Sequence, residues 1–321
     1  NFRLKSSLWK NILNIKKMKF YLLLLSFIIV PVFTGCIDSE DNNKLIINRS
    51  EIGNSCFLNE SISQRQESIL VGDSVRKYSL SVPKKLSGEK LPVILAFHGG
   101  NEGGFYFPQQ PSFERLSNNE KIIIAYPQAK KEINNEGAWQ LNTDENKMQD
   151  INFIENLINY IQEEHCGDPS KTYAIGYSLG SMFTYELACH LSNKFVSIAS
   201  FAGTMPINPK SCETDKSINI MHIHGKNDQV ISYSDSWEWK NWNSVGTMMD
   251  IKTLISFWGD KNLCLSKSSQ DLSEYSEITY SDCKDNTKVK LFALNKVGHD
   301  WPEEINSTST NEFIWNFLKE N

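Results

Sequence analysis

A serine that could act as a nucleophile stands in the Gly-Tyr-Ser-Leu-Gly motif of residues 176–180. A short apolar run that starts at Tyr173 leads into the motif, and a helix-like segment, residues 181–191, follows it at once. A serine on such a strand-to-helix turn presents its hydroxyl at the carboxyl edge of a parallel sheet, where ligands bind. The two glycines allow the strained backbone of the turn and leave room where strand and helix meet. The motif therefore predicts that Ser178 is a catalytic nucleophile.

A serine nucleophile requires a base that takes its proton and a carboxylate that orients this base. Asp228 lies four residues beyond an apolar run, residues 218–224, and comes after the serine in the chain. A loop that follows a strand is where this chemistry places its carboxylate. We therefore predict that Asp228 is the acid, with Asp235 and Asp260 as alternatives. An ordinary turn aspartate is the other interpretation of Asp228.

His299 is the predicted general base. It follows the last apolar run, residues 289–294, and precedes a C-terminal helix-like segment, which completes the chain order serine, aspartate, histidine. A structural histidine is the alternative. His222 and His224 lie on a predicted strand, and we expect His224 to orient a loop rather than to catalyse.

A tetrahedral intermediate also needs N–H groups that stabilise its negative oxygen. One donor should be the N–H of Leu179, which directly follows the nucleophile. The other should come from the His-Gly-Gly sequence of residues 98–100, with Gly100 as the first choice and Gly99 as the second. His98 is a candidate for substrate contact, although we expect it to hold the loop. A simple Gly-Gly turn is the alternative.

Two tryptophans are candidates for the wall of a substrate pocket. Trp139 lies in a long segment without periodicity, residues 128–147, and long loops often line sites. Trp301 lies two residues beyond His299. Core packing is the alternative for both.

Strands that alternate with helices should position these residues. Continuous apolar runs suit strands buried on both faces of a parallel sheet, and apolar residues at helical spacing indicate helices. The expected strands are residues 92–97, 121–126, 195–201, 218–224 and 289–294, and the expected helices are residues 150–163, 181–191, 247–258 and 310–320. A hairpin from residues 68–71 to 75–82 precedes them. The pattern predicts one α/β domain, residues 68–321, with a doubly wound, mainly parallel sheet and helices on both faces.

The N-terminal segment is predicted to lie outside this domain. Residues 1–17 look like upstream sequence, because the chain begins with Asn and Met18 is a natural start. Residues 18–35 hold a short apolar run after basic residues, as export signals do. The run ends in a sequence that resembles a bacterial lipobox, so Cys36 is the predicted lipidation site; an ordinary cleaved signal is the alternative. Residues 36–67 are polar and are predicted to tether the domain to a membrane.

Charge and cysteine content limit the expected partners. The net charge is −5 and no long basic run occurs, which argues against nucleic acid. Apart from Cys36, six cysteines remain, and an even number in an exported protein suggests disulfides. Free buried thiols are the alternative. No Cys-x-x-Cys spacing occurs, so we expect no zinc site, and the predicted chemistry requires no metal or cofactor.

With these residues in place, the chain resembles the polyhydroxybutyrate-depolymerase-like and feruloyl-esterase-like branch of the α/β-hydrolases, which is often grouped with carbohydrate esterase family one. The most specific motif is Gly-His-Asp-Trp-Pro, residues 298–302. The other matching motifs are residues 98–100, 126–129, 150–154, 176–180, 201–204 and 223–228. The resemblance implies an α/β-hydrolase fold with Ser178 as nucleophile, Asp228 as acid and His299 as base.

The resemblance also bears on the cysteines and on one departure from the family. It implies a disulfide between Cys264 and Cys283, and it suggests a second between Cys189 and Cys212. Cys56 and Cys166 then remain as a third pair by elimination. Relatives often carry a second glycine where this chain has Ser181, which should alter the entry of the helix slightly.

The sequence thus predicts an exported or membrane-tethered serine esterase. The family acts on hydroxycinnamoyl, acetyl and polyester substrates, so the expected partner is an ester, including esters on polysaccharides or polyesters. One alternative is a serine peptidase of the same fold, since the same triad cleaves amides. The other is a non-catalytic surface lipoprotein that binds glycans.

Overall fold

A computed structural model of the chain describes residues 61–100, 107–130, 139–238 and 245–320. The strands of the main sheet are β1 (Ile62–Val71), β2 (Ser74–Val82), β3 (Leu91–Phe97), β4 (Ile123–Pro127), β5 (Gly167–Tyr177), β6 (Ser197–Phe201), β7 (Asn219–Gly225), β10 (Ser266–Asp271), β11 (Tyr275–Ser281) and β12 (Val289–Leu294). Two short ladders pair β8 (Trp237–Glu238) with β9 (Thr247–Met248), and β13 (Glu304–Ile305) with β14 (Thr308–Ser309). The helices are α1 (Gln110–Glu120), α2 (Gln149–Glu164), α3 (Leu179–His190), α4 (Ile251–Lys261), α5 (Thr310–Lys319) and the short 3-10 helix η2 (Lys284–Asn286).

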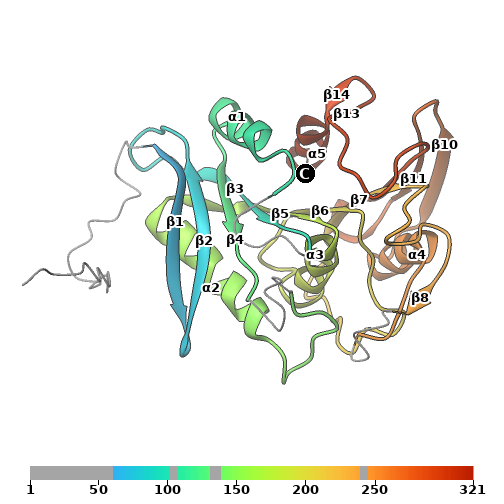
Figure 1. Cartoon of the computed structure of the whole chain (residues 1–321), viewed down its shortest axis with the longest axis horizontal. Coiled ribbons are helices and arrows are strands. Elements are labelled where there is room, and N and C mark those ends of the chain that lie inside the picture. Colours follow the sequence, from blue (N-terminus) through green and yellow to red (C-terminus); the bar gives the residue numbers. More distant parts are fainter. Residues whose placement is uncertain (1–60, 101–106, 131–138, 239–244, 321) are drawn as a thin grey trace, which may run out of the picture. The chain divides into compact units, whose positions relative to one another are not determined.

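The strand order of the main sheet is β1-β2-β4-β3-β5-β6-β7-β12-β11-β10 (Figure 1). The strands from β4 to β12 in this order run parallel to one another. Antiparallel strands flank them, β2 and β1 at one edge and β11 and β10 at the other. The carboxyl ends of the parallel strands therefore meet at a single edge of the sheet, where residues from distant parts of the chain come together.

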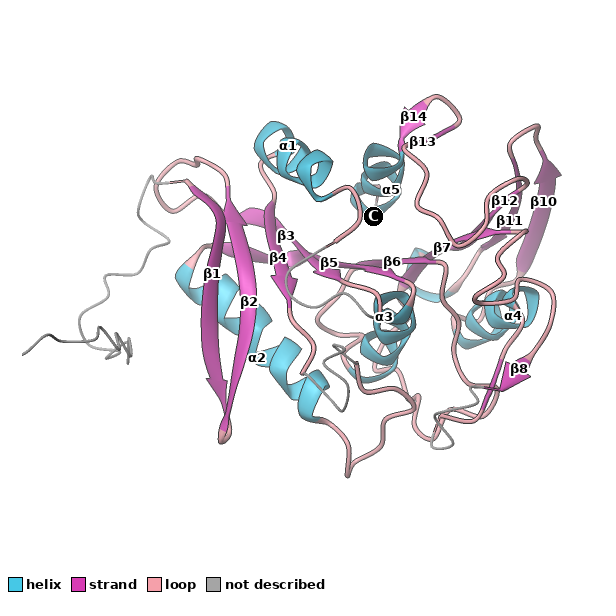
Figure 2. Ribbon diagram, viewed as in Figure 1, coloured by secondary structure: helices cyan, strands magenta, loops and turns pink. Residues whose placement is uncertain are grey.

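Helices cover both faces of the sheet. Figure 2 shows α2, α3 and α4 on one face and α1 and α5 on the other. Alternate side chains of a strand enter two separate hydrophobic cores, because successive side chains point to opposite faces. In β3, Leu95 packs with the core under α2 and α3, whereas Ile94 packs with the core under α1 and α5. The predicted doubly wound, mainly parallel sheet is thereby confirmed.

Several element boundaries differ from the sequence prediction. The helix expected over residues 247–258 begins only at Ile251, because the Asp250 carboxylate accepts a hydrogen bond from the Thr253 N–H and caps it there. The strand that leads to the serine starts at Gly167 rather than near Tyr173. Helix α1 was not predicted at all.

The first strand begins before the expected start of the domain at residue 68. β1 starts at Ile62 and pairs with β2 along its length, with an irregularity between Ile62 and Arg65. Most of its side chains are exposed, although Ile62, Ile69 and Val71 pack against the core, so its membership of the sheet rests mainly on backbone hydrogen bonds with β2. The part of the predicted tether from Ile62 to Glu67 therefore belongs to the fold.

Two disulfides occur among the described residues. One joins Cys264 to Cys283 and closes the β10–β11 hairpin, and the other joins Cys189 of α3 to Cys212. These are the two pairings that the family resemblance suggested. Cys56, the inferred partner of Cys166, lies outside the described residues.

The predicted export signal, lipidation site and most of the tether also lie outside the described residues. Within the part of the chain that the structure does describe, no helix is both long enough and apolar enough to span a bilayer.

Candidate active site

Ser178 lies at the junction between β5 and α3. Its backbone angles are φ 52° and ψ −117°, a combination that a residue with a β-carbon adopts only under strain. The Ser178 N–H donates to the Phe201 carbonyl of β6, and its own carbonyl accepts from the Met182 N–H in the first turn of α3. Neighbouring strand and helix thus hold the serine in the sharp turn that the motif predicted.

Two glycines make this turn possible. A β-carbon at position 176 would lie 2.2 Å from the Gly180 carbonyl oxygen, and one at position 180 would lie 2.1 Å from the Phe97 carbonyl oxygen. Both distances are far below van der Waals contact, so any side chain would push α3 away from β3 and β5. The glycines are required by close approach, as the motif implied.

Replacing Gly180 by alanine should therefore destabilise the protein by about 1–3 kcal/mol or more, because the new methyl group would collide with backbone. Thermal unfolding would measure the loss. The control is Gly72→Ala, where a β-carbon would meet nothing within 4 Å and only the positive φ of the hairpin turn is strained. A Gly180→Ala variant with the same melting temperature as the wild type would contradict the close approach of Gly180 to the Phe97 carbonyl.

Ser181, the departure from the usual second glycine, is accommodated by a neighbouring glycine. Its hydroxyl is hydrogen-bonded to the Ser200 hydroxyl of β6, and both side chains are buried. A β-carbon at Gly203 would lie 2.3 Å from the Ser181 Oγ. Position 181 can carry a small side chain because position 203 carries none.

The structure brings the three predicted catalytic side chains together. The His299 Nε2 lies 2.9 Å from the Ser178 Oγ, and the His299 Nδ1 lies 2.7 Å from the Asp228 Oδ2. Asp235, an alternative acid, is exposed and instead accepts hydrogen bonds from nearby serines. Asp260, the other alternative, is exposed on α4. Asp228 is thus the carboxylate within reach of the imidazole.

Asp228 is held ionised. Its Oδ1 accepts from the backbone N–H groups of Val230 and Ile231, at 2.8 Å each, and its side chain is fully buried. Burial acts to raise the pKa of Asp228, but hydrogen bonds from His224, His299 and Ile231 outweigh it and leave the pKa well below its usual range. A carboxylate at this position favours the His299 tautomer with hydrogen on Nδ1, so that the Nε2 lone pair faces Ser178.

The residues that carry the two predicted oxyanion donors are neighbours in the structure. A β-carbon on Gly100 would be 3.8 Å from Leu179 Cδ2, so the loop after β3 adjoins the residue after the nucleophile. His98 is buried and does not face a substrate: its Nδ1–H donates to the Gly99 carbonyl at 2.7 Å, and its Nε2 accepts from the Ala129 N–H at 3.1 Å. Burial lowers the pKa of His98, which keeps the ring neutral. His98 therefore holds the glycine loop instead of contacting substrate.

Trp139 likewise belongs to the core rather than to a pocket wall. Its side chain is fully buried, stacks on Phe183 with ring centroids 4.6 Å apart, and meets Phe97 edge-on. Its Nε1–H donates to the His98 carbonyl at 3.0 Å. The loop position suggested a site residue, but tertiary packing places the ring under the glycine loop, where it supports His98.

Trp301 remains beside the predicted base. It is half-buried, stacks on Phe201 at 4.6 Å and meets Tyr177 edge-on at 5.9 Å. Its buried Nε1 has no hydrogen-bond partner among the described residues. Tyr177, which the sequence reasoning missed, donates from its hydroxyl to the His299 carbonyl. An aromatic residue directly before the nucleophile was the available signal.

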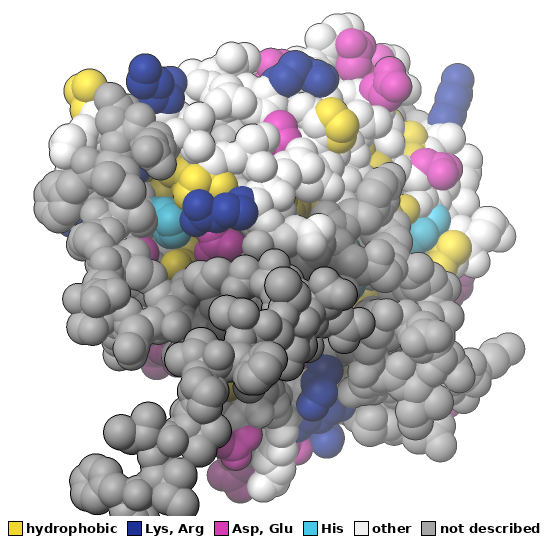
Figure 3. All heavy atoms as spheres, turned by 60° about the vertical axis from the view of Figure 1, so that its left-hand side comes forward, with side chains coloured by type: hydrophobic (Ala, Val, Ile, Leu, Met, Phe, Trp, Pro, Cys, Tyr) yellow, Lys and Arg dark blue, Asp and Glu magenta, His cyan; other side chains and the backbone are white. Residues whose placement is uncertain are grey.

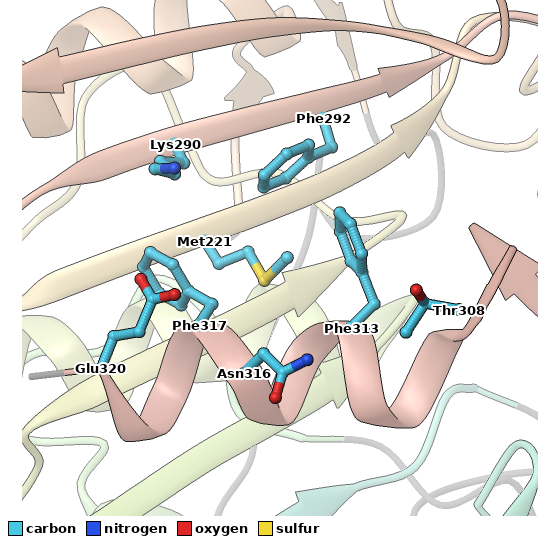
Figure 4. A pocket seen from close by; sticks show the side chains of 8 residues that line it. All are labelled: Met221, Lys290, Phe292, Thr308, Phe313, Asn316, Phe317 and Glu320. Atoms are coloured by element: carbon cyan, nitrogen blue, oxygen red, sulfur yellow. The ribbon is translucent and has the colours of Figure 1, made fainter. Parts of the chain in front are cut away.

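Other surface features lie apart from the triad. A hollow of about 210 Å³ between β12, β7 and α5 is bordered by Met221, Phe292 and Phe313, and no triad residue lines it (Figure 4). On the face shown in Figure 3, acidic and basic side chains of the described residues are interspersed. Among the described residues, no group of three or more His, Cys, Asp or Glu side chains could hold a metal ion.

A family model described as Phospholipase/Carboxylesterase matches residues 90–250. Feruloyl esterase B of Piromyces equi is 22% identical over 249 residues, which cover 76% of this chain and 45% of that protein. The bifunctional acetylxylan esterase/xylanase XynS20E of Neocallimastix patriciarum is 21% identical over 236 residues, which cover 71% of this chain and 31% of that protein. The matched region therefore spans less than half the length of either relative.

Two solved structures share the fold. Acetyl xylan esterase from Aspergillus awamori superposes with a TM-score of 0.61 at 13% identity, over 79% of this chain and 98% of that one. A ferulic acid esterase from Anaeromyces mucronatus, in complex with ferulic acid, gives a TM-score of 0.52 at 15% identity, over 82% and 91%. The resemblance to feruloyl-esterase-like α/β-hydrolases is thus confirmed. Because the family model covers half of the chain, the chain belongs to the phospholipase/carboxylesterase family, with an α/β-hydrolase fold.

Proposed function

We propose that this protein is a serine esterase that hydrolyses carboxylic esters through Ser178, His299 and Asp228. The observation that carries the proposal is the hydrogen-bonded series from the Ser178 hydroxyl through the His299 ring to the Asp228 carboxylate. Members of the family act as carboxylesterases or phospholipases, which supports an ester as the substrate.

In the proposed reaction, the Ser178 Oγ bonds to the ester carbonyl carbon while the His299 Nε2 takes the hydroxyl proton. The N–H groups of Leu179 and Gly100 would stabilise the negative charge on the carbonyl oxygen. The imidazolium then gives its proton to the leaving alcohol, and an acyl-enzyme remains. Water attacks the acyl carbon with His299 again as base, which releases the acid and restores Ser178.

The substrate class that we favour is a feruloyl or acetyl ester on a polysaccharide. Relatives named feruloyl esterase and acetylxylan esterase support it. The aromatic side chains of Trp301, Tyr177 and Phe201 contact one another beside His299, and aromatic faces suit a flat acyl group. Polyester substrates remain the next candidate.

Export and membrane attachment are part of the proposal. Residues 18–35 would be a signal peptide, Cys36 would carry lipid, and the polar residues that follow would tether the domain. Disulfides support an exported protein, because they persist in oxidising compartments. A metabolic acyl label should appear on the cell-associated protein and vanish with Cys36→Ala. Wild-type protein that takes up no acyl label would contradict the lipid anchor.

Two measurements test the esterase proposal together. A fluorophosphonate probe should label the domain, and a panel of p-nitrophenyl acetate, methyl ferulate, acetylated xylan and a hydroxybutyrate oligomer should reveal the preferred ester. Turnover of methyl ferulate or acetylated xylan supports the favoured class. Hydrolysis of peptides in preference to every ester would support the peptidase alternative. Folded protein that takes no label and turns over no ester would favour the glycan-binding alternative.

Replacing Trp301 by alanine should raise KM for methyl ferulate by about tenfold relative to p-nitrophenyl acetate, because an aromatic contact of typical strength is lost only for the aromatic acyl group. Steady-state kinetics on both esters checks this, and the ratio of the two KM values removes any effect that the substitution has on both substrates alike. An unchanged ratio would take Trp301 out of the pocket.

A further inference from the structure

A chain of buried polar side chains leads to Asp228 from behind. The Tyr185 hydroxyl lies 2.7 Å from the His222 Nδ1, and the His222 Nε2 lies 3.1 Å from the His224 Nδ1. The His224 Nε2 then lies 2.9 Å from the Ile231 carbonyl oxygen and 3.3 Å from the Asp228 Oδ2. Tyr185, His222 and His224 are all fully buried.

The acceptors beside Asp228 fix the direction of the hydrogen bonds that His224 makes there. Among the described residues, the His224 Nε2 faces the Ile231 carbonyl and the Asp228 carboxylate, so it carries hydrogen and donates to them. Burial, together with the adjacent His224, lowers the pKa of His222 well below its usual value, which agrees with a neutral His222 ring. The His222 ring bridges the His224 Nδ1 and the Tyr185 hydroxyl, and so holds the His224 ring with its Nε2–H toward Asp228.

The buried series from Tyr185 to His224 supplies the last hydrogen bond to the Asp228 carboxylate. An ionised aspartate offers about four acceptor sites. The N–H groups of Val230 and Ile231 occupy the Oδ1, and His299 and His224 occupy the Oδ2. His224 also binds the Ile231 carbonyl, so it holds both the carboxylate and the loop that presents it.

The geometry points to His224 as a positioning residue of the proposed esterase reaction: it locks the Asp228 loop, while His222 and Tyr185 hold the orientation of its ring. The inference rests on the proposed function. Tyr185 lies on α3 about two turns beyond Ser178. The hydrogen-bonded series of Tyr185, His222 and His224 therefore links α3, which begins directly after the nucleophile, to the loop that carries the acid.

Ser200 and aromatic side chains surround the buried series from Tyr185 to His224. His224 faces His222 within β7, the Asp228 loop and the ring of Tyr233, whose centroid is 6.1 Å away. Tyr185 stacks on Trp258 with ring centroids 5.8 Å apart. Two imidazoles inside a buried strand cost desolvation unless each nitrogen is hydrogen-bonded, and here each is.

A matched pair of substitutions at His224 tests the inference. His224→Asn retains an amide group near the Nδ1 position, where it still hydrogen-bonds to His222, but the side chain is too short to reach Asp228. His224→Gln places its NH₂ group near the Nε2 position and keeps the donor. Rates with p-nitrophenyl acetate would be measured from acid to alkaline pH on the whole protein, with melting curves for each variant.

We expect His224→Asn to lower kcat by about tenfold with little change in KM, which corresponds to a lost hydrogen bond to a charged group. The acidic limb of kcat/KM should move to lower pH, because a loosened Asp228 stabilises the His299 imidazolium less. His224→Gln should restore most of both. A purely structural role would change the melting curves alone, so a folded Asn variant with the wild-type kcat and acidic limb would overturn the inference.

Two further variants keep the outcome decisive. If His224→Asn does not fold, Tyr185→Phe decides, since it keeps ring volume and stacking while removing the hydroxyl that holds the His222 ring. The Tyr185→Phe substitution should lower kcat severalfold. An unchanged kcat would overturn the inference that Tyr185 and His222 support His224. Ser178→Ala separates the two proposals: hydrolysis that does not depend on Ser178 would overturn the esterase proposal and this inference with it.

Discussion

Ser178→Ala should lower kcat for p-nitrophenyl acetate by about 10⁴–10⁶-fold, with KM nearly unchanged. Alanine removes the atom that forms the acyl-enzyme, whereas the strained turn, the glycine loop and the pocket stay in place. The small remaining rate would come from binding and from the N–H groups around the carbonyl oxygen. Stopped assays with high enzyme concentration would measure it.

Labelling with a fluorophosphonate gives an independent check on the same variant. The label should disappear with Ser178→Ala and persist with Ser181→Ala, which removes the neighbouring buried hydroxyl on the same helix. Label that survives the loss of Ser178 would show that another nucleophile reacts, and the assignment of the triad would be wrong.

Asp228→Asn should lower kcat by about 10⁴-fold. An amide cannot satisfy its surroundings here. If its oxygen accepts from the His299 Nδ1–H, its NH₂ group faces the N–H groups of Val230 and Ile231; if it is flipped, it favours the wrong His299 tautomer. Measuring kcat with one activated ester and one natural ester would show whether both half-reactions suffer.

The matched control for this substitution is Asp235→Asn. Asp235 lies in the same loop region but is exposed and bonded only to nearby serines, so the change should leave kcat within about twofold, as is usual for surface positions. A large loss with Asp235→Asn, and a small one with Asp228→Asn, would reverse the assignment of the acid.

The sequence located the central strands and the catalytic candidates because their signals are local. Apolar runs such as residues 289–294 coincide with β12 in the structure. The glycines around Ser178 mark a turn whose geometry depends on immediate neighbours. Ser178, Asp228 and His299 each follow a parallel strand, and the carboxyl ends of parallel strands meet at one edge of the sheet.

Features that depend on distant contacts could not be predicted in this way. β1 has few buried side chains and is fixed by its backbone partners in β2. Trp139 lies in a sequence segment without periodicity, and only the packing of Phe97 and Phe183 around it shows that it belongs to the core. His222 and His224 did leave a signal, because residues two apart on a strand share a face. Their partner Tyr185, on another element, was visible only in the structure.

The close approach of Gly203 to Ser181 has a consequence for how such sequences can change over time. Two positions 22 residues apart share one small space, so a side chain at either restricts what the other can accept. A lineage that gains a hydroxyl at the start of α3 becomes committed to glycine at position 203, and substitutions at the two sites are not independent. Residue swaps between relatives at this turn should therefore be made in pairs.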